Sequence, residues 1–192
     1  MPAKEEFPIL TFASASAWEA WLRKHHAETD GLWIRIAKKE SGIASVGYEE
    51  ALDEALCHGW IDGQKKPFDS EYYLQKFTPR RPKSLWSKRN IEKIAALTAA
   101  GRMRPAGLAE AEAAKRDGRW KAAYASPKDM SVPEDFVKAL EGDEKAQRFF
   151  LGLSRANLYA IAWRLETAKT PETRQRRFEA LLAMIKNGEK LH

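Results

Sequence analysis

The stretch FTPRRPKSLWSKRN, residues 77–90, divides the chain into two parts with different sequence patterns. Before it, alternating apolar runs typical of strands are mixed with helical periodicity, whereas only helical patterns follow it. Pro79 and Pro82 hold the junction extended, because proline fixes its own φ and restricts the residue before it. The chain is therefore expected to contain an α+β unit over residues 1–82 and a helical region over residues 83–192. Whether the helical region packs as one continuous domain with the first unit stays open.

The part before the junction has the pattern of a small, mostly antiparallel sheet with helices. Leu32, Ile34 and Ile36 alternate with residues of the opposite face, as in a half-buried strand. A capping box at Ser16 and Glu19 marks the start of the first helix. The expected elements, in chain order, are a strand at 7–12, a helix at 14–26, a strand at 31–40, a helix at 48–59 and a strand pair at 60–66 and 71–80.

The part after the junction carries the signals of six helices. In the first, Ser84 is the expected N-cap and Gly101 the stop. A capping box at Ser131 and Glu134 marks a later start, and Thr170 followed by a proline marks the last one. The expected helices span residues 84–101, 104–118, 131–142, 143–153, 154–169 and 170–188.

The net charge of +6 is unevenly distributed along the chain. Residues 1–77 carry 9 basic and 13 acidic residues, a net charge of −4, and residues 122–192 carry 12 and 10, a net charge of +2. Residues 78–121 carry 12 basic and 4 acidic residues, a net charge of +8. Such a basic block favours an anionic small molecule, a nucleic acid or an acidic protein surface as partner, or else forms a solvated helix face.

Composition excludes several protein classes. No apolar run approaches the roughly 18 residues that span a bilayer, so no membrane insertion is expected. The acidic N-terminus lacks the pattern of a secretory signal, and we expect the protein in the cytoplasm. Its lone cysteine, Cys57, cannot form an internal disulfide. The four histidines, which show no metal-binding spacing, are His25, His26, His58 and His192. Neither a metal nor another cofactor is therefore predicted.

The stretch ALCHGWIDG, residues 55–63, raises the question of a thiol active site. Cys57 and His58 are adjacent on a predicted helix, so their side chains point about 100° apart and cannot form a nucleophile–base pair. Cys57 lies beside the apolar stripe and is expected to be buried as a small hydrophobe. His58 shares a face with Glu54 or caps the helix end. Asp62 could accept a hydrogen bond.

The junction itself has the composition of an anion-binding site. A helix beginning at Ser84 would offer backbone N–H groups to an anion, and Trp86 would offer a stacking face. Asn90, four residues later, would share the face of Trp86. Alternatively, Trp86 anchors the helix to the sheet while the arginines solvate it. A second basic and aromatic cluster occurs at Arg119 and Trp120. The predicted ligand-binding residues are Trp60, Asp62, Arg80, Lys83, Trp86, Asn90, Arg102, Arg119 and Trp120.

Four stretches occur together in one order: EALCHGWIDG, FTPRRPKSLWSKRN, GRMRPAGLAEAEAAKRDGRWKAAY and AKTPETRQRR. In this the chain resembles the YdeI/OmpD-associated, or bacteriocin-protection, family over Phe7 to Asn187. The resemblance implies stress or antimicrobial-peptide protection, or association with a porin. It implies no reaction, cofactor or catalytic residue. His58 stands where an aromatic residue is frequent in that family, which argues against an essential role for the pair it forms with Cys57.

The sequence therefore favours a non-enzymatic binding protein for an anionic ligand, with a site between the two parts of the chain. One alternative is a nucleic-acid-binding protein that uses residues 78–121. Another is an enzyme whose acid and base groups come from Glu54, Cys57, His58 and Asp62. A role in protein interaction alone is the remaining alternative.

Overall fold

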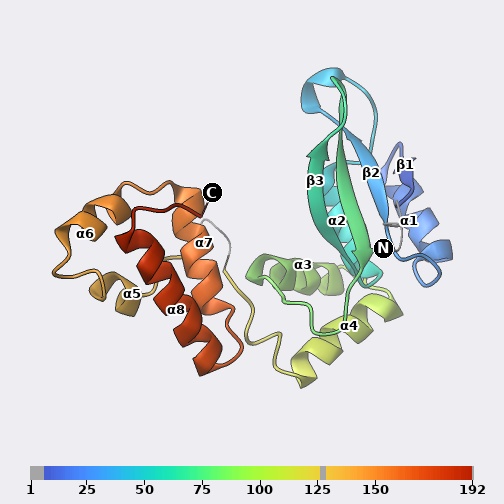
Figure 1. Ribbon diagram of the computed structural model, residues 1–192. Coiled ribbons are helices and arrows are strands. Elements are labelled where there is room, and N and C mark those ends of the chain that lie inside the picture. The colour runs from blue at the N-terminus through green and yellow to red at the C-terminus, as the bar shows by residue number, and fades with distance from the viewer. Residues whose placement is uncertain (1–6, 126–128, 192) are drawn as a thin grey trace, which may run out of the picture. The chain divides into compact units, whose positions relative to one another are not determined.

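The computed structural model describes residues 7–125 and 129–191, which form two compact units (Figure 1). Residues 7–86 and 90–123 form the first, here called the sheet unit, and residues 87–89, 124–125 and 129–191 form the second, the helical unit. His192 lies outside the described residues. The change of pattern after residue 82 does not coincide with the division between the units, because two helices that follow it pack with the sheet.

The sheet has four strands in the order β1-β2-β4-β3. They span Ile9–Thr11 (β1), Leu32–Ala37 (β2), Trp60–Pro67 (β3) and Tyr72–Pro79 (β4). β1 pairs with β2 in parallel, and the other two pairings are antiparallel. The pairing of β3 with β4 shifts register between Asp62 and Lys65. The prediction of an α+β fold with a small, mostly antiparallel sheet, followed by helices, is confirmed.

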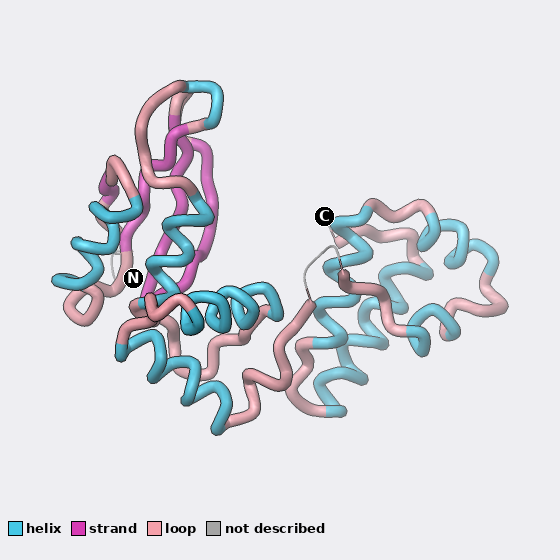
Figure 2. Tube along the Cα trace, turned by 180° about the vertical axis from the view of Figure 1, so that it is seen from behind, coloured by secondary structure: helices cyan, strands magenta, loops and turns pink. Residues whose placement is uncertain are grey.

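One face of the sheet is covered by α1 (Ala15–His25) and α2 (Tyr48–Cys57), as Figures 1 and 2 show from opposite sides. The alternation of β2 places Leu32, Ile34 and Ile36 in the core beneath them. The indole N–H of Trp18, from α1, donates to the carbonyl oxygen of Ala51 on α2 at 3.0 Å. Burial of this apolar face stabilises the unit by roughly 25 cal/mol per Å².

Helix α1 begins earlier than its predicted capping box. Ser14 is the N-cap, and its hydroxyl accepts a hydrogen bond from the N–H of Ala17 at 3.3 Å. The predicted box at Ser16 and Glu19 is therefore wrong. Serines two residues apart, at 14 and 16, both suit an N-cap, and the sequence pattern did not separate them.

The predicted helix start at Ser84 is also wrong, because α3 spans Lys88–Ala99. Residues before it are held in an irregular path, with Lys83 in the left-handed region at φ 67°. The guanidinium of Arg119 donates to the carbonyl oxygen of Ser84 at 3.1 Å, a long-range contact that the local pattern does not contain. Trp86 therefore precedes the helix and does not share a helix face with Asn90.

Helix α4 (Pro105–Arg116) packs closely against the end of α2. Gly107 makes this possible, because a Cβ at this position would overlap the carbonyl oxygens of Cys57 and Leu56. The N–H of Arg104 donates to the carbonyl oxygen of Cys57 at 3.1 Å. These contacts fix the start of α4 beside the last turn of α2.

The helical unit contains α5 (Glu134–Lys138), α6 (Glu144–Leu151), α7 (Arg155–Glu166) and α8 (Pro171–Lys186). Thr170 caps α8 and a proline occupies its first turn, as predicted. The predicted capping box at Ser131 is wrong, because Pro133 occupies the N-cap position of α5. Leu181 and Ile185 of α8 are buried in the core of this unit.

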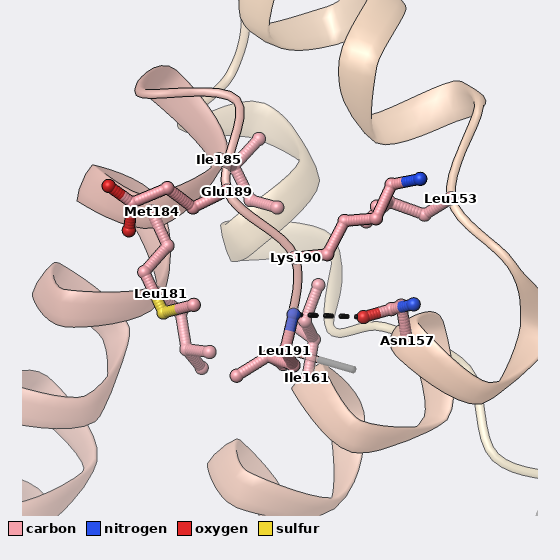
Figure 3. A pocket seen from close by; sticks show the side chains of 9 residues that line it. All are labelled: Leu153, Asn157, Ile161, Leu181, Met184, Ile185, Glu189, Lys190 and Leu191. Carbon is pink, nitrogen blue, oxygen red and sulfur yellow. Dashed lines mark hydrogen bonds between the residues drawn. The ribbon is translucent and has the colours of Figure 1, made fainter.

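In the helical unit, Leu191 is held by a hydrogen bond at a small pocket shown in Figure 3. Buried Asn157 on α7 accepts the N–H of Leu191 at 3.0 Å through its side-chain oxygen. The pocket leaves no room for a water molecule. Its lining is mostly apolar and includes Leu153, Ile161 and Leu181. We therefore interpret it as a packing feature of the helical core.

Candidate functional site

The sheet unit contains a groove of about 250 Å³ where three helix ends meet. The end of α1 contributes Arg23 and the following His26, and the end of α2 contributes the following His58. The start of α4 contributes the remaining wall. The lining residues are Arg23, His26, His58, Arg104, Pro105 and Ala106. This groove is here called the His58 groove.

The chain path at the end of α2 explains why His58 lies in this groove. The N–H of His58 continues the hydrogen bonding of the helix, and Gly59 then turns the chain at φ 77° into β3. A Cβ at Gly59 would lie 3.0 Å from the carbonyl oxygen of Ala106, so the turn also allows α4 to approach. The glycine that follows the histidine in the sequence thus serves both the turn and the groove.

Both imidazoles of the groove have one nitrogen engaged and one available. Nδ1 of His58 lies 3.0 Å from the carbonyl oxygen of Glu54, and Nδ1 of His26 lies 2.9 Å from that of Leu22. A carbonyl oxygen only accepts, so each Nδ1 carries the proton and donates. Within residues 7–125 and 129–191, neither Nε2 has a hydrogen-bond partner. The two rings lie 5.6 Å apart between centroids.

Burial lowers the pKa of His58 below its ordinary value near 6.5, and the nearby His26 lowers it further. The hydrogen bond to the Glu54 carbonyl opposes this shift in part. The His58 ring, only 3% exposed, is therefore neutral at pH 7. Its Nε2 then holds a lone pair that accepts a hydrogen bond from a ligand.

The walls of the groove are basic. Arg104 pairs with Glu19 at 3.0 Å between Nη2 and Oε1. Arg23 is exposed and has no carboxylate partner among the residues that the structure describes. Two guanidinium groups beside one carboxylate leave excess positive charge at the mouth of the groove, which favours an anion there.

Cys57 belongs to the core and not to the groove. Its side chain is fully buried, and burial, aided by the charge of Glu54, raises the thiol pKa from 9.0 to about 11. The thiol is therefore protonated at neutral pH, whereas a nucleophilic cysteine needs a thiolate. The structure thus assigns Cys57 to packing.

The acid and base groups of the enzyme hypothesis do not converge. Asp62 accepts a hydrogen bond from the hydroxyl of Tyr48 at 2.8 Å, at the start of α2. His58 follows the other end of α2, where its side chain lines the groove and Asp62 does not. Glu54 pairs with Arg102 at 2.6 Å. The two carboxylates thus have separate partners, and Cys57 is inside the core.

Four of the predicted ligand-binding residues do lie together. The guanidinium of Arg80 stacks on Trp86 with its Cζ 3.5 Å from the ring centroid, and the Trp120 ring lies 5.0 Å from that of Trp86. Arg119 joins them through the carbonyl oxygen of Ser84 at 3.1 Å. However, Trp86 is only 1% exposed and Arg80 only 6%, so a ligand would meet only the partly exposed Arg119 and Trp120.

The other five predicted residues are scattered over the sheet unit. Trp60 is buried, and its indole N–H donates to the carbonyl oxygen of His26 at 3.0 Å, beneath the His58 groove. Asn90 is buried near the start of α3, and Lys83 is exposed on the irregular segment before it. Arg102 is exposed and paired with a glutamate, while Asp62 faces α2.

Ion pairs within the sheet unit explain much of the uneven charge along the chain. Lys93 of α3 lies 2.6 Å from Asp53 and 2.9 Å from Glu49 of α2. The pairs of Arg102 and Arg104 likewise join the basic segment to acidic α1 and α2. Exposed pairs of this kind contribute about 0–1 kcal/mol each. Lys93, Arg102 and Arg104 thus pair with acidic residues of the first 77 inside the sheet unit.

Sequence reasoning missed three groove residues, Arg23, His26 and Arg104. Their stretches, RKHH at the end of α1 and RPA at the start of α4, are about 80 residues apart. No spacing rule links them, and only the meeting of the helix ends brings them together. Within the described residues, no group of three or more His, Cys, Asp or Glu side chains could hold a metal ion. No helix there is long and apolar enough to cross a membrane.

Two family models match different parts of the chain. Residues 10–110 match the family described as Domain of unknown function (DUF8412). Residues 129–188 match the family described as Bacteriocin-protection, YdeI or OmpD-Associated. The predicted YdeI/OmpD-associated resemblance is therefore confirmed within the helical unit, whereas the residues that form the His58 groove fall under the other model. No curated protein and no solved structure matches the chain.

Proposed function

We propose, on the premise that the chain belongs to the family described as Domain of unknown function (DUF8412), that its sheet unit binds a small anionic ligand in the His58 groove. The ligand class is an oxyanion that also carries an O–H donor, as inorganic phosphate does at neutral pH. The proposal keeps the anionic ligand expected from the sequence and places it on different residues.

The chemistry of the groove supports this ligand class. The guanidinium of Arg23 and the free donors of Arg104 form charge-assisted hydrogen bonds to oxyanion oxygens. Neutral His58 accepts the remaining proton of the ligand at Nε2. The first turn of α4 adds backbone N–H groups without helical partners, together with the positive end of the helix dipole.

One observation carries the proposal. His58 is buried almost completely, it lines the groove, and its Nε2 has no partner within the described chain. Nε2 is not one of the fully buried polar atoms of the described chain that lack a partner, so it is reached from the groove. A ligand in the groove that carries an O–H donor can therefore bond to it.

The process that we propose for this binding is protection against bacteriocins or related stress in the cytoplasm. The match of residues 129–188 to the Bacteriocin-protection, YdeI or OmpD-Associated family supports the process. The location comes from the composition of the chain.

Isothermal titration calorimetry with inorganic phosphate tests the site. Replacing Arg23→Met should weaken binding about tenfold or more, because one charge-assisted hydrogen bond contributes about 1.5–3 kcal/mol. Lys24→Met is the matched control, since it removes the same charge one residue away and outside the groove. It should change the affinity less than twofold.

The same titration with His58→Phe should also lose affinity, because phenylalanine keeps an aromatic ring but removes the acceptor. Equal effects of the Arg23 and Lys24 substitutions, or the absence of saturable binding to phosphate and to a phosphate monoester, would show that the groove is not an anion site.

A further inference from the structure

The second face of the sheet is not covered by α1 or α2, which both pack on the first (Figures 1 and 2). Strand register identifies the residues on it. Trp33 lies opposite Lys76, and Arg35 lies opposite Leu74. Lys66 of β3 lies opposite Leu74 on its other side. This surface, on the side away from buried Leu32, Ile34 and Ile36, is here called the open face.

Basic and aromatic side chains form a layer on the open face. The Lys66 ammonium lies 4.3 Å from the ring centroid of Trp33. The Lys76 ammonium lies 3.8 Å from the ring centroid of Phe7 and 6.0 Å from that of Trp33. Trp33, on central strand β2, thus has two cations beside its ring, both from the side of β4 and β3, and the residue is partly exposed.

Arg35 continues this layer toward the hairpin between β3 and β4. Its guanidinium carbon lies 5.5 Å from the ring centroid of Phe68 and 5.9 Å from that of Tyr72. Phe68 is 45% exposed, which is unusual for a phenylalanine. Leu74 beneath is 1% exposed although it lies outside the main core cluster, so the layer itself shields it from water.

Two of the three cations on the open face, Arg35 and Lys66, are not balanced locally. The paired strand positions that share this face contain no carboxylate; they are Ile9, Thr11, Trp33, Arg35, Ala37, Ile61, Lys66, Tyr72, Leu74, Lys76 and Thr78. Neither Arg35 nor Lys66 forms an ion pair with any described residue. Moreover, Nε of Arg35 is buried without a hydrogen-bond partner there. This contrasts with Lys93, Arg102 and Arg104, which pair with acids of α1 and α2.

We propose that the open face binds single-stranded nucleic acid, with bases on the Trp33, Tyr72 and Phe68 rings and phosphates at Arg35, Lys66 and Lys76. Exposed rings interleaved with cations on a sheet are the combination that single strands use, because every base has a stacking surface and every linkage a charge. An acidic peptide would satisfy the cations but not the rings. The inference does not depend on the His58 groove, which lies elsewhere in the sheet unit.

Fluorescence anisotropy of labelled 12-residue oligo(dT) and oligo(rU), titrated with the full chain, tests this inference. Binding should saturate and weaken steeply as salt rises. Lys66→Met keeps the length of the side chain but removes its charge. It should weaken binding several-fold and reduce the log–log salt slope by about 0.7, the value for one phosphate contact on a single strand.

Lys24→Met on α1 removes the same charge far from the open face and should leave both quantities unchanged. Trp33→Leu should weaken binding by at least about fivefold through lost stacking, with folding checked by thermal melting. Four results would overturn the inference: no saturable binding, equal effects of the Lys66 and Lys24 substitutions, equally tight binding of duplex DNA, or equally effective competition by poly-glutamate. Excess inorganic phosphate, which would fill the His58 groove, should not compete beyond its ionic strength.

Discussion

Gly107 of α4 lies against the carbonyl oxygen of Cys57 so closely that no side chain fits between them. The adjacent hydrogen bond from the Arg104 N–H to the same oxygen, at 3.1 Å, aligns the two helix ends. This one contact places the start of α4 beside His58. The groove therefore depends on a glycine that takes no direct part in binding.

Gly107→Ala should destabilise the sheet unit. Alanine favours a helix by up to about 1 kcal/mol over glycine, but the added methyl would overlap backbone atoms that cannot move independently. We expect a net loss of about 1–3 kcal/mol and weaker phosphate binding, measured by thermal unfolding and calorimetry. The control is Gly152→Ala, where the added atom would lie 3.6 Å from its nearest neighbours. A Gly107 variant as stable as the control would show that α4 can shift at little cost.

Part of the fold follows from local patterns and part does not. The alternation of Leu32, Ile34 and Ile36 predicts β2 and its buried face correctly, since burial on one side imposes a period of two. The prediction that α3 starts at Ser84 is wrong, because the guanidinium of Arg119, 35 residues later, donates a hydrogen bond to the Ser84 carbonyl oxygen. Local propensity favours a cap there, and a tertiary hydrogen bond overrides it.

For the candidate sites too, the local sequence pattern does not show which distant residues meet. The sequence indicates a basic and aromatic cluster, and the structure does bring Arg80 and Trp86 together, but as packed side chains. The His58 groove and the open face are built from residues far apart along the chain, which meet only through helix packing and strand register. Among the groove residues, only His58 was singled out in the sequence, as a possible partner of Cys57. Its proposed role comes from its place in the groove and not from that cysteine.

Stability should fall at alkaline pH because of Cys57. Burial raises the thiol pKa from 9.0 to about 11, so the folded state holds this proton more tightly than the unfolded state. The contribution is complete below pH 9 and is lost as the pH rises toward 11, with a size of up to about 3 kcal/mol. Urea unfolding between pH 8 and 11 should show a steeper decline for the wild type than for Cys57→Ala, which does not titrate. Parallel curves would mean that water reaches the thiol.

His58 should have the opposite pH dependence. Its pKa in the folded state lies below the unfolded value near 6.5, so the unfolded state binds the proton more readily. Its contribution is present above pH 6.5 and is lost as the pH falls through the folded pKa. NMR titration of the His58 ring should report a pKa below that of an exposed histidine. Adding phosphate should shift this pKa, because the ligand O–H that donates to Nε2 favours the neutral ring while the negative charge of the ligand favours the protonated one.

A ring pKa for His58 that does not move when phosphate is added at saturating concentration would separate this histidine from the ligand.

Arg80→Lys separates the packed basic and aromatic cluster from the His58 groove. Lysine keeps the charge but cannot reproduce the planar guanidinium, which lies 3.5 Å from the Trp86 ring and donates to the carbonyl oxygen of Leu85 at 3.3 Å. We expect a loss of about 1–2 kcal/mol in stability, measured by thermal unfolding, and unchanged phosphate affinity. The control is Arg81→Lys at the exposed neighbouring residue, which should change neither the stability nor the phosphate affinity. If Arg80→Lys instead weakens phosphate binding while stability is kept, the ligand sits at Trp86, and the position originally indicated by the sequence would replace the groove.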